Sequence, residues 1–254
     1  MDDAIERGQI PGAVVHVEHA GENFRHVSGW RSVAPTVEPM TEDTIFDVAS
    51  LTKVVATAPA IMKLVEEGKV ALEAPVGAYV RAFVGEGREV VTVRQLLSHT
   101  SGLPAGIRHD AAAPWDGYDE GIARACREPL RSTPGTRFLY SDVNFILLGE
   151  IVRQVSGQWI SEFARRVLFD PLGMKDTGFL PAEAIRPRIA PTEYGAGGGA
   201  LARRGARPDE PSDGRPVRSR RTVLDRGRSG ALLSHGAQSR CAGRSASAGR
   251  GHGA

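Results

Sequence analysis

The feature that most constrains the fold of this chain is a change in composition after Tyr194. Residues 195–254 contain 13 Gly, 10 Ala and 12 Arg, and they lack Ile, Phe, Tyr, Trp, Met, Asn and Lys. A segment with so little apolar surface cannot offset the conformational entropy that is lost when it orders. We therefore expect residues 1–194 to form the folded domain and residues 195–254 to be a disordered tail.

The same boundary divides the charge. Residues 1–194 carry 20 Lys and Arg against 26 Asp and Glu, whereas residues 195–254 carry 12 Arg against 4 acidic residues. A basic tail can bind nucleic acid, but this tail has no aromatic residue on which a base could stack. We expect no nucleic-acid partner.

The sequence contains no targeting signal. No apolar run approaches the ~20 residues that a helix needs to span a bilayer. The N-terminus (Met1, Asp2, Asp3) lacks the basic start and apolar stretch of a signal peptide. We expect no membrane span and a cytoplasmic location for the chain as written; an upstream segment would make it periplasmic or secreted. No pattern in the sequence specifies an oligomeric state.

Two cysteines, Cys126 and Cys241, are too few for a disulfide framework. Cys126 lies in a stretch with a helical pattern, residues 121–127, where we expect a small core or surface residue. The cysteines therefore predict neither a covalent scaffold nor thiol catalysis.

The hydrophobic pattern of residues 1–194 predicts a hairpin followed by helices. Apolar residues at 13–17 and 24–27, separated by Gly21-Glu22-Asn23, are typical of a β-hairpin. Four later segments have apolar residues at helical spacing: 50–67, 93–98, 142–155 and 160–169. This order predicts an α/β or α+β fold with a sheet that contains the N-terminal strands.

Ser50-Leu51-Thr52-Lys53 is an S-x-x-K element at the start of the first predicted helix. Because residues three apart share a helix face, the Lys53 side chain can lie beside the Ser50 hydroxyl. A serine hydroxyl becomes a nucleophile when a neighbour takes its proton, and a lysine with a depressed pKa can do so. Free N–H groups at the helix start also favour developing negative charge. The element therefore predicts a nucleophilic Ser50 assisted by Lys53.

Three strings, in order along the chain, carry a resemblance to a known family. They are Phe46-Asp47-Val48-Ala49-Ser50-Leu51-Thr52-Lys53, Leu96-Leu97-Ser98-His99-Thr100-Ser101-Gly102-Leu103 and Tyr140-Ser141-Asp142-Val143-Asn144-Phe145. Together they resemble the nucleophile motif, the LLxHTSGL helix end and the Y-S-[ND] motif of the penicillin-recognising serine hydrolases. That superfamily comprises β-lactamases, D,D-peptidases and related esterases. The resemblance covers about residues 1–194, and the combination of strings makes it specific.

The resemblance implies a β-lactamase/transpeptidase-like fold, in which an antiparallel sheet with flanking helices carries a helical subdomain. It implies that Tyr140 shares the proton transfers with Lys53, first as base and then as acid to the leaving group. Either Asp142, at a position that is Asn in many members, or Asn144 would orient Lys53. The Ser50 N–H and one from a later strand would form the oxyanion hole. The implied activity is acylation of Ser50 by a small-molecule ester, amide or β-lactam, followed by hydrolysis or transfer, without a metal or other cofactor.

Other interpretations of these residues remain open at the level of sequence. His99 allows a Ser-His-Asp triad with Ser101 or Ser50, although no G-x-S-x-G elbow surrounds any serine and the His-Thr-Ser-Gly turn of the family is structural. The other histidines lack metal-ligand spacing. The Ala-Ser-Leu-Thr-Lys and Tyr-Ser-Asp forms are associated with esterase and peptidase-like members, so antibiotic hydrolysis ranks lower. The alternative from another class is a non-catalytic remnant or binding module of the same fold.

The third motif of the family, Lys-Thr-Gly or His-x-Gly on a central strand, does not follow Tyr140 in this sequence. The resemblance stops where the Arg/Gly/Ala tail begins. In a shifted codon frame, residues 203–232 are compatible with GEVHDxxxxLMGGLSGHAGLFSTAADLARF, which resembles the stretch expected next in the family. We therefore predict a one-base frameshift near residues 194–202. The loss of the last strands would leave an unpaired sheet edge and half an active site, in an inactive or unstable molecule.

Overall fold

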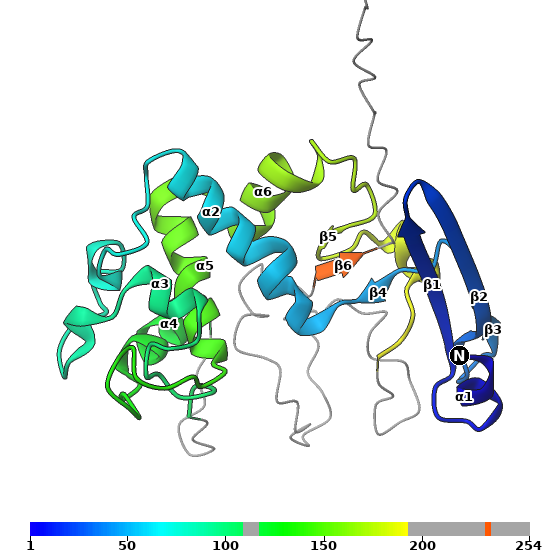
Figure 1. Cartoon of the computed structure of the whole chain (residues 1–254), viewed down its shortest axis with the longest axis horizontal. Coiled ribbons are helices and arrows are strands. Elements are labelled where there is room, and N and C mark those ends of the chain that lie inside the picture. Colours follow the sequence, from blue (N-terminus) through cyan, green and yellow to red (C-terminus); the bar gives the residue numbers. More distant parts are fainter. Residues whose placement is uncertain (109–116, 193–231, 235–254) are drawn as a thin grey trace, which may run out of the picture.

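The computed structural model of this chain describes residues 1–108, 117–192 and 232–234. These residues form a β-hairpin at one end and a helical body at the other, with short strands between them (Figure 1). The frameshift predicted near residues 194–202 lies outside the described residues, as does Cys241. Leu232–Ser234, within the segment expected to be disordered, form a strand.

The N-terminal hairpin confirms the predicted one and is longer than the apolar runs indicated. Strand β1 (Gly12–His19) pairs antiparallel with β2 (Glu22–Ser32), preceded by the short helix α1 (Asp2–Glu6). Ala20 and Gly21 form the two-residue turn with φ of +50° and +87°. This left-handed geometry matches the twist of two paired strands.

The described strands form two sheets, and the first is the predicted sheet that contains the N-terminal strands. β3 (Glu38–Pro39) completes the first sheet in the order β1-β2-β3. The second sheet has the order β4-β6-β5 and consists of β4 (Phe46–Asp47), β5 (Gly178–Phe179) and β6 (Leu232–Ser234). Both neighbours of β6 run antiparallel to it. The second sheet is separate because β4 pairs with β6 and not with the hairpin; the outer edge of β1 pairs with no strand within the described part of the chain.

The chain turns from β4 into a long helix that changes its winding. The 3₁₀ turn η1 (Ala49–Leu51) is followed by the π-helical turn η2 (Lys53–Thr57) and then by α2 (Ala58–Glu66). Gly68, with φ of +69°, follows the last turn. The helix predicted over residues 50–67 is confirmed, but its first half is irregular.

The remaining predicted helices are confirmed as α3 (Val93–Leu97), α5 (Asp142–Ser156) and α6 (Ile160–Ala164), the last continued by the π-helical turn η5 (Arg165–Phe169). One further helix, α4 (Tyr118–Arg127), contains the buried Cys126. Three short 3₁₀ segments are η3 (Val76–Ala78), η4 (Arg88–Val90) and η6 (Glu183–Arg188). None of the described helices is both long and apolar enough to cross a bilayer.

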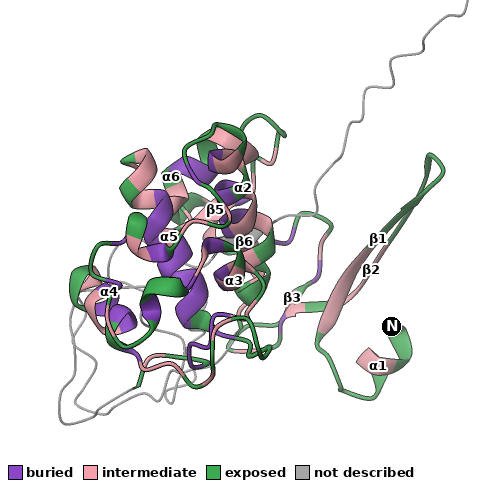
Figure 2. Cartoon of the chain, turned by 60° about the vertical axis from the view of Figure 1, so that its left-hand side comes forward, coloured by how far each residue is buried: buried purple, intermediate pink, exposed green. Residues whose placement is uncertain are grey.

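The main core lies in the helical body, where the buried residues gather, whereas the hairpin is intermediate or exposed (Figure 2). Leu64 of α2, Leu96 of α3, Leu147 of α5 and Phe163 of α6 are at most 1% exposed. Burial of each such side chain contributes roughly 1.5–3 kcal/mol. Because α2 and α5 pack against each other, the N-terminal ends of their helical segments present Ser50 and Asp142 to one region.

Candidate active site

Ser50 lies in η1, which connects β4 to the long helix, and Ser50 is exposed. Ala49 before it has φ of +45°, a left-handed backbone that costs a non-glycine residue energy. Two hydrogen bonds hold this turn. The Ala49 N–H donates to Asp47 Oδ1 at 2.8 Å, and the Thr52 hydroxyl donates to the Ala49 carbonyl at 2.6 Å. The strained turn therefore presents Ser50 at the exposed start of the helix.

Lys53 reaches back along the helix toward Ser50. Its Nζ donates to Ser50 Oγ at 3.4 Å and forms an ion pair with Asp142 Oδ1 at 2.7 Å. The Lys53 side chain is 14% exposed, whereas that of Asp142 is 58% exposed. The three-residue spacing thus brings the lysine and the serine together.

The charge state of Lys53 differs from the one that the S-x-x-K pattern predicts. Burial lowers the pKa of Lys53, but hydrogen bonds to Asp142 and Tyr140 and the charge of Asp142 outweigh the burial and raise the pKa overall. Lys53 is therefore an ammonium at neutral pH. In this state it donates to Ser50 and cannot accept the serine proton.

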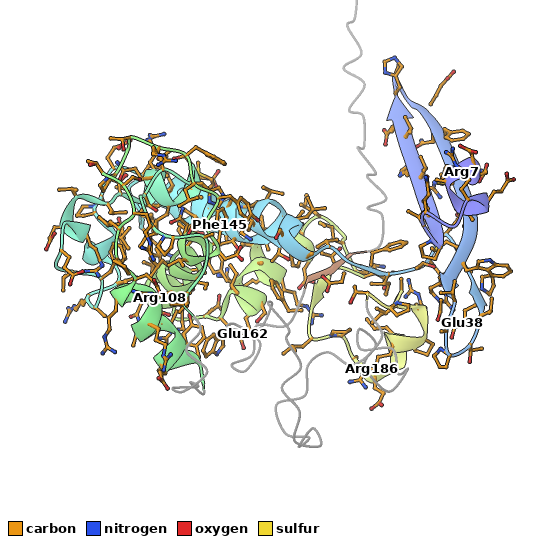
Figure 3. The ribbon with its side chains drawn as sticks, turned by 90° about the horizontal axis from the view of Figure 1, so that it is seen from below. Arg7, Glu38, Arg108, Phe145, Glu162 and Arg186 are labelled. Carbon is orange, nitrogen blue, oxygen red and sulfur yellow. The ribbon has the colours of Figure 1, made fainter. Side chains whose placement is uncertain are left out.

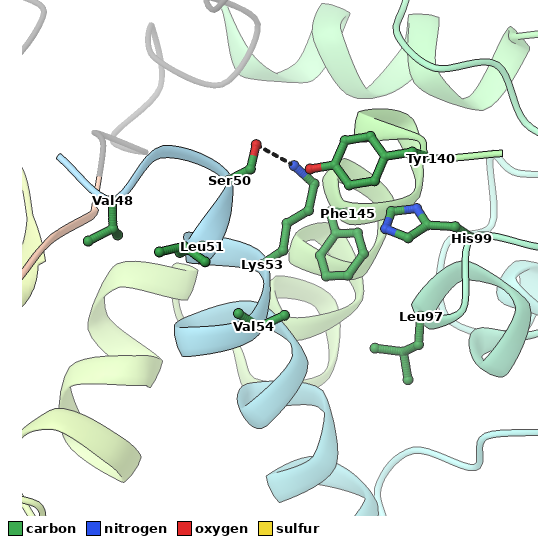
Figure 4. Close-up of a pocket in the computed structure, with 9 residues that line it drawn as sticks. All are labelled: Val48, Ser50, Leu51, Lys53, Val54, Leu97, His99, Tyr140 and Phe145. Carbon is green, nitrogen blue, oxygen red and sulfur yellow. Dashed lines mark hydrogen bonds between the residues drawn. The ribbon is translucent and has the colours of Figure 1, made fainter. Parts of the chain in front are cut away.

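Tyr140 lies beside Lys53, with Nζ 5.0 Å from the centroid of its ring. Figure 4 shows the Ser50 hydroxyl, the Lys53 nitrogen and the Tyr140 hydroxyl converging at one side of a pocket. The pocket has a volume of about 450 Å³, within the range of small-molecule sites. Its other lining residues are Val48, Leu51, Val54, Leu97, His99 and Phe145.

The apolar lining is the part of the site that sequence patterns did not reveal. Leu51 and Val54 are 59% and 62% exposed, although their helical spacing is typical of core residues. The Phe145 ring centroid is 5.7 Å from the Lys53 ammonium. Figure 3 shows Phe145 in the helical body, far from the hairpin. One sequence signal could have indicated this lining: Leu51 and Val54 directly follow Ser50 and Lys53, the two polar residues that define the S-x-x-K element.

Asp142 and Asn144 both lie at the start of α5 but have different partners. Asp142 contacts Lys53 through its carboxylate. Asn144 is fully buried; its Oδ1 accepts from Ser101 Oγ at 2.6 Å and its Nδ2 lies 3.4 Å from His99 Nδ1. Of the two residues considered for orienting the lysine, Asp142 makes the contact, and Asn144 connects α5 to the turn that follows α3.

The residues of the alternative Ser-His-Asp interpretation are not arranged as a triad. Ser101 is 1% exposed, and its hydroxyl donates to Asn144. The Nδ1 atom of His99 accepts from the Ser141 N–H at 3.1 Å. Ser50 contacts the lysine ammonium described above.

Cys126 is buried in α4, as a core residue. Burial, together with the charge of Glu150, raises the pKa of its thiol to about 11. The thiol therefore stays protonated near neutral pH. In the part of the chain that the structure describes, no three His, Cys, Asp or Glu side chains gather in a group suited to holding a metal ion.

Comparison with known proteins identifies the family of this chain. A family model described as Beta-lactamase matches residues 1–249. Over 203 residues the chain is 34% identical to esterase EstB of Burkholderia gladioli, which covers 73% of this chain and 51% of that protein. Over 216 residues it is 32% identical to an N-acetylmuramyl-L-alanine amidase of Bacillus subtilis, which covers 76% of this chain and 49% of that protein.

Solved structures agree on the fold. The octameric penicillin-binding protein homologue from Pyrococcus abyssi has a TM-score of 0.68 and 27% identity, over 92% of this chain and 51% of that chain. A class C beta lactamase has a TM-score of 0.68 and 23% identity, over 92% of this chain and 59% of that one. These likenesses confirm the predicted β-lactamase/transpeptidase-like fold.

The extent of the matches bears on the tail. This chain spans about half the length of the two curated relatives named above. The family match continues past Tyr194 to residue 249, through the region where a frameshift is predicted. The frameshift stays a prediction, which the DNA sequence around codons 190–240 would test.

Proposed function

Because this chain belongs to the beta-lactamase family, we propose that it is a serine hydrolase that forms an acyl-enzyme on Ser50. Its substrates are carboxylic esters or amides, a class that includes D-Ala-D-Ala-like peptides and β-lactams. The observation that supports this most is the convergence of Ser50, Lys53 and Tyr140 at one pocket. A hydroxyl, an amine and a phenol in one small site can activate a serine and return its proton to a leaving group.

The proton balance of the reaction follows from the charge of Lys53. Ser50 must lose its proton as Oγ attacks the carbonyl carbon, and an ammonium cannot take that proton. The Lys53–Tyr140 pair must therefore first hold one proton fewer, as a coupled pair. It then accepts the Ser50 proton and delivers it to the leaving alcohol or amine as the bond to the acyl group breaks. In the second half of the reaction, water attacks the acyl-enzyme in place of Ser50. The Lys53–Tyr140 pair accepts a proton from the water and returns it to Ser50 Oγ as the carboxylic acid is released.

We propose that the hydrolase activity of this chain is impaired, for two reasons. Asp142 holds Lys53 in its ammonium form and opposes the proton loss that acylation needs. No third motif follows Tyr140 to supply the second oxyanion donor beside the Ser50 N–H. The same two observations favour the second candidate function, a non-catalytic remnant or binding module that keeps the pocket without turnover.

The pocket lining supports neutral esters over substrates that carry a carboxylate. Most of its side chains are aliphatic or aromatic, which suits an apolar acyl or alcohol group. Lys53 is the cation among the lining residues, and Asp142 already neutralises it. An anionic β-lactam or peptide terminus would therefore meet no unpaired cation among these lining residues.

A fluorophosphonate probe tests the nucleophile. We expect stoichiometric labelling of the chain that Ser50→Ala abolishes and that Ser161→Ala, a serine of α6 away from the pocket, leaves intact. A folded protein that resists the probe would support the remnant instead. Turnover of nitrophenyl esters compared with nitrocefin then separates an esterase from a β-lactamase. The same assays on a frame-restored version measure how far the written chain is impaired.

A further inference from the structure

We propose that His99 is a positioning residue, which holds Tyr140 in the pocket by binding the backbone on both sides of the tyrosine. The functional consequence of this contact rests on the proposed role of Tyr140 in proton transfer, but the contact itself does not.

The backbone of His99 adopts the geometry that this double contact needs. Its φ is +57°, in the left-handed region that non-glycine residues rarely occupy. Its carbonyl accepts from the Leu139 N–H at 2.9 Å, and its Nδ1 accepts from the Ser141 N–H at 3.1 Å. Both neighbours of Tyr140 are thus hydrogen-bonded to one residue. Such strain persists where the surrounding structure enforces it, often at functional sites.

The imidazole also supports the tyrosine ring. The ring centroids of His99 and Tyr140 lie 4.6 Å apart, with the planes tilted by 35°. Two phenylalanines pack against the imidazole in turn. The centroid of the Phe145 ring lies 5.1 Å from that of His99, and the Phe138 ring approaches His99 edge-on at 5.8 Å. Tyr140 itself is 44% exposed, so much of its ring faces solvent. The imidazole is therefore a principal contact that orients an otherwise open side chain.

This arrangement requires a neutral imidazole. The Ser141 N–H points at Nδ1, and the Asn144 amide nitrogen lies 3.4 Å from the same atom. Nδ1 must offer its lone pair, so the ring proton lies on Nε2. Protonation would place a second N–H against the Ser141 N–H and break that hydrogen bond.

The charges around His99 favour the neutral form. Burial lowers its pKa, the Lys53 ammonium lowers it further, and the Asp142 carboxylate opposes both. Among the described residues, the phenol of Tyr140 also faces the ring. Because the pKa of His99 is lowered, the hydrogen bond from the Ser141 N–H to Nδ1 is intact at pH values above the ordinary pKa of histidine. It is lost as the pH falls through the pKa of His99.

The first test follows Tyr140 directly by NMR, whatever the activity of the chain. In the full-length protein, the Tyr140 backbone and ring resonances should shift with the His99 titration. His99→Asn should abolish that shift, because the amide oxygen can replace Nδ1 as an acceptor, tolerates positive φ and does not titrate. His19→Asn, at an exposed histidine at the end of β1, is the matched control and should leave the titration unchanged.

The second test measures the rate of Ser50 labelling by a fluorophosphonate across pH. His99→Ala removes both the acceptor and the ring, and should slow labelling by about 10- to 100-fold. His99→Asn should restore most of that rate and remove the part of the acid decline that follows the His99 titration, while the part set by proton loss from the Lys53–Tyr140 pair remains. Thermal unfolding of both variants shows whether they fold.

The two tests separate the proposals. If Tyr140 resonances ignore the His99 titration, or if folded His99→Ala labels like the wild type, the positioning role is wrong. If neither the wild type nor any variant labels while the Tyr140 titration is as expected, the serine-hydrolase function fails and the positioning contact stands.

Discussion

Replacement of Glu150 by Gln should destabilise this fold far more than the same change at Glu66. The side chain of Glu150, in α5, is 3% exposed. Its carboxylate accepts from the Tyr118 hydroxyl at 2.7 Å, from Arg153 Nε and Nη2 at 2.8 and 2.9 Å, and from Gln154 Nε2 at 2.6 Å. Every one of these donors needs an oxygen, and the amide of a glutamine would offer only one.

The expected cost follows from burial. Removal of one member of a buried ion pair costs about 3–5 kcal/mol. The Arg153 side chain is 33% exposed and regains some water, so we expect about 2–3 kcal/mol for Glu150→Gln. Glu66 pairs with Lys63 on the surface, and its side chain is 70% exposed. There the same substitution should have no measurable effect, because solvent screens such pairs.

Urea denaturation of both variants and of the wild type at several pH values measures this difference. Burial raises the pKa of Glu150, but the hydrogen bonds from Arg153, Gln154 and Tyr118 outweigh it and lower the pKa overall. A carboxyl group whose pKa is lowered in the folded state stabilises the fold at pH values above the ordinary pKa of that group. This stability disappears as the pH falls through the folded-state pKa. The gap between wild type and Glu150→Gln should therefore narrow in acid. Equal unfolding midpoints for the two variants, or a gap that ignores pH, would refute the reasoning.

Three further predictions concern single groups. Asp142→Asn removes the charge that raises the pKa of Lys53, so the rise of Ser50 labelling with pH should move to lower pH; a rise that stays in place or moves to higher pH would contradict the proposed proton balance. Gly102→Ala should cost about 2–3 kcal/mol in urea unfolding, because Gly102 has φ of +85° and a Cβ there would collide with the Ser132 carbonyl oxygen. In a Cys241→Ser chain, which keeps Cys126 as its one thiol, Cys126 should resist a chromogenic disulfide reagent at pH 8 until urea unfolds the chain, since its thiol is buried and its pKa is raised; rapid native-state labelling of that chain would show that α4 opens.

Long periodic segments were predictable from the sequence. The α5 helix begins at Asp142 after the capping Ser141, whose hydroxyl accepts from the Asn144 N–H, and ends at Gly157 with φ of +71°. Such signals are local, so the sequence contains them. The β4 and β5 strands, by contrast, are two residues long and too short to show an alternating pattern.

The sequence predicts that Ser50 and Lys53 lie together in the candidate site, but it does not predict the charge state of Lys53. The spacing of Ser50 and Lys53 places the two side chains together whatever else surrounds them. The charge of Lys53 depends on a balance between burial and the contact with Asp142, a residue nearly ninety positions away in the chain. No spacing rule predicts the sign of such a balance, and here the sign is the reverse of the expected one.

The role of His99 was hidden for a related reason. Its motif is recognisable, but its φ of +57° and its acceptor role toward Ser141 exist only after α3 and α5 pack together. From sequence alone, the residue was a candidate for a triad or for a structural turn. The positioning proposal arises from the tertiary contact.

The central place of β6 in the second sheet also has a consequence for how the chain folds as it is synthesised. Phe46 pairs with Ser234, and Phe179 with Leu232, so β4 and β5 reach each other only through a strand made much later than either. The helical body has its own core and can close first, because every residue of that core, from Ala60 to Phe163, precedes β6 in the chain. Until β6 arrives, β4 and β5 are open strand edges that another nascent chain could pair with. If the ribosome pauses between α6 and β6, the core of the helical body can therefore fold while β4 and β5 still lack the strand that pairs with both of them.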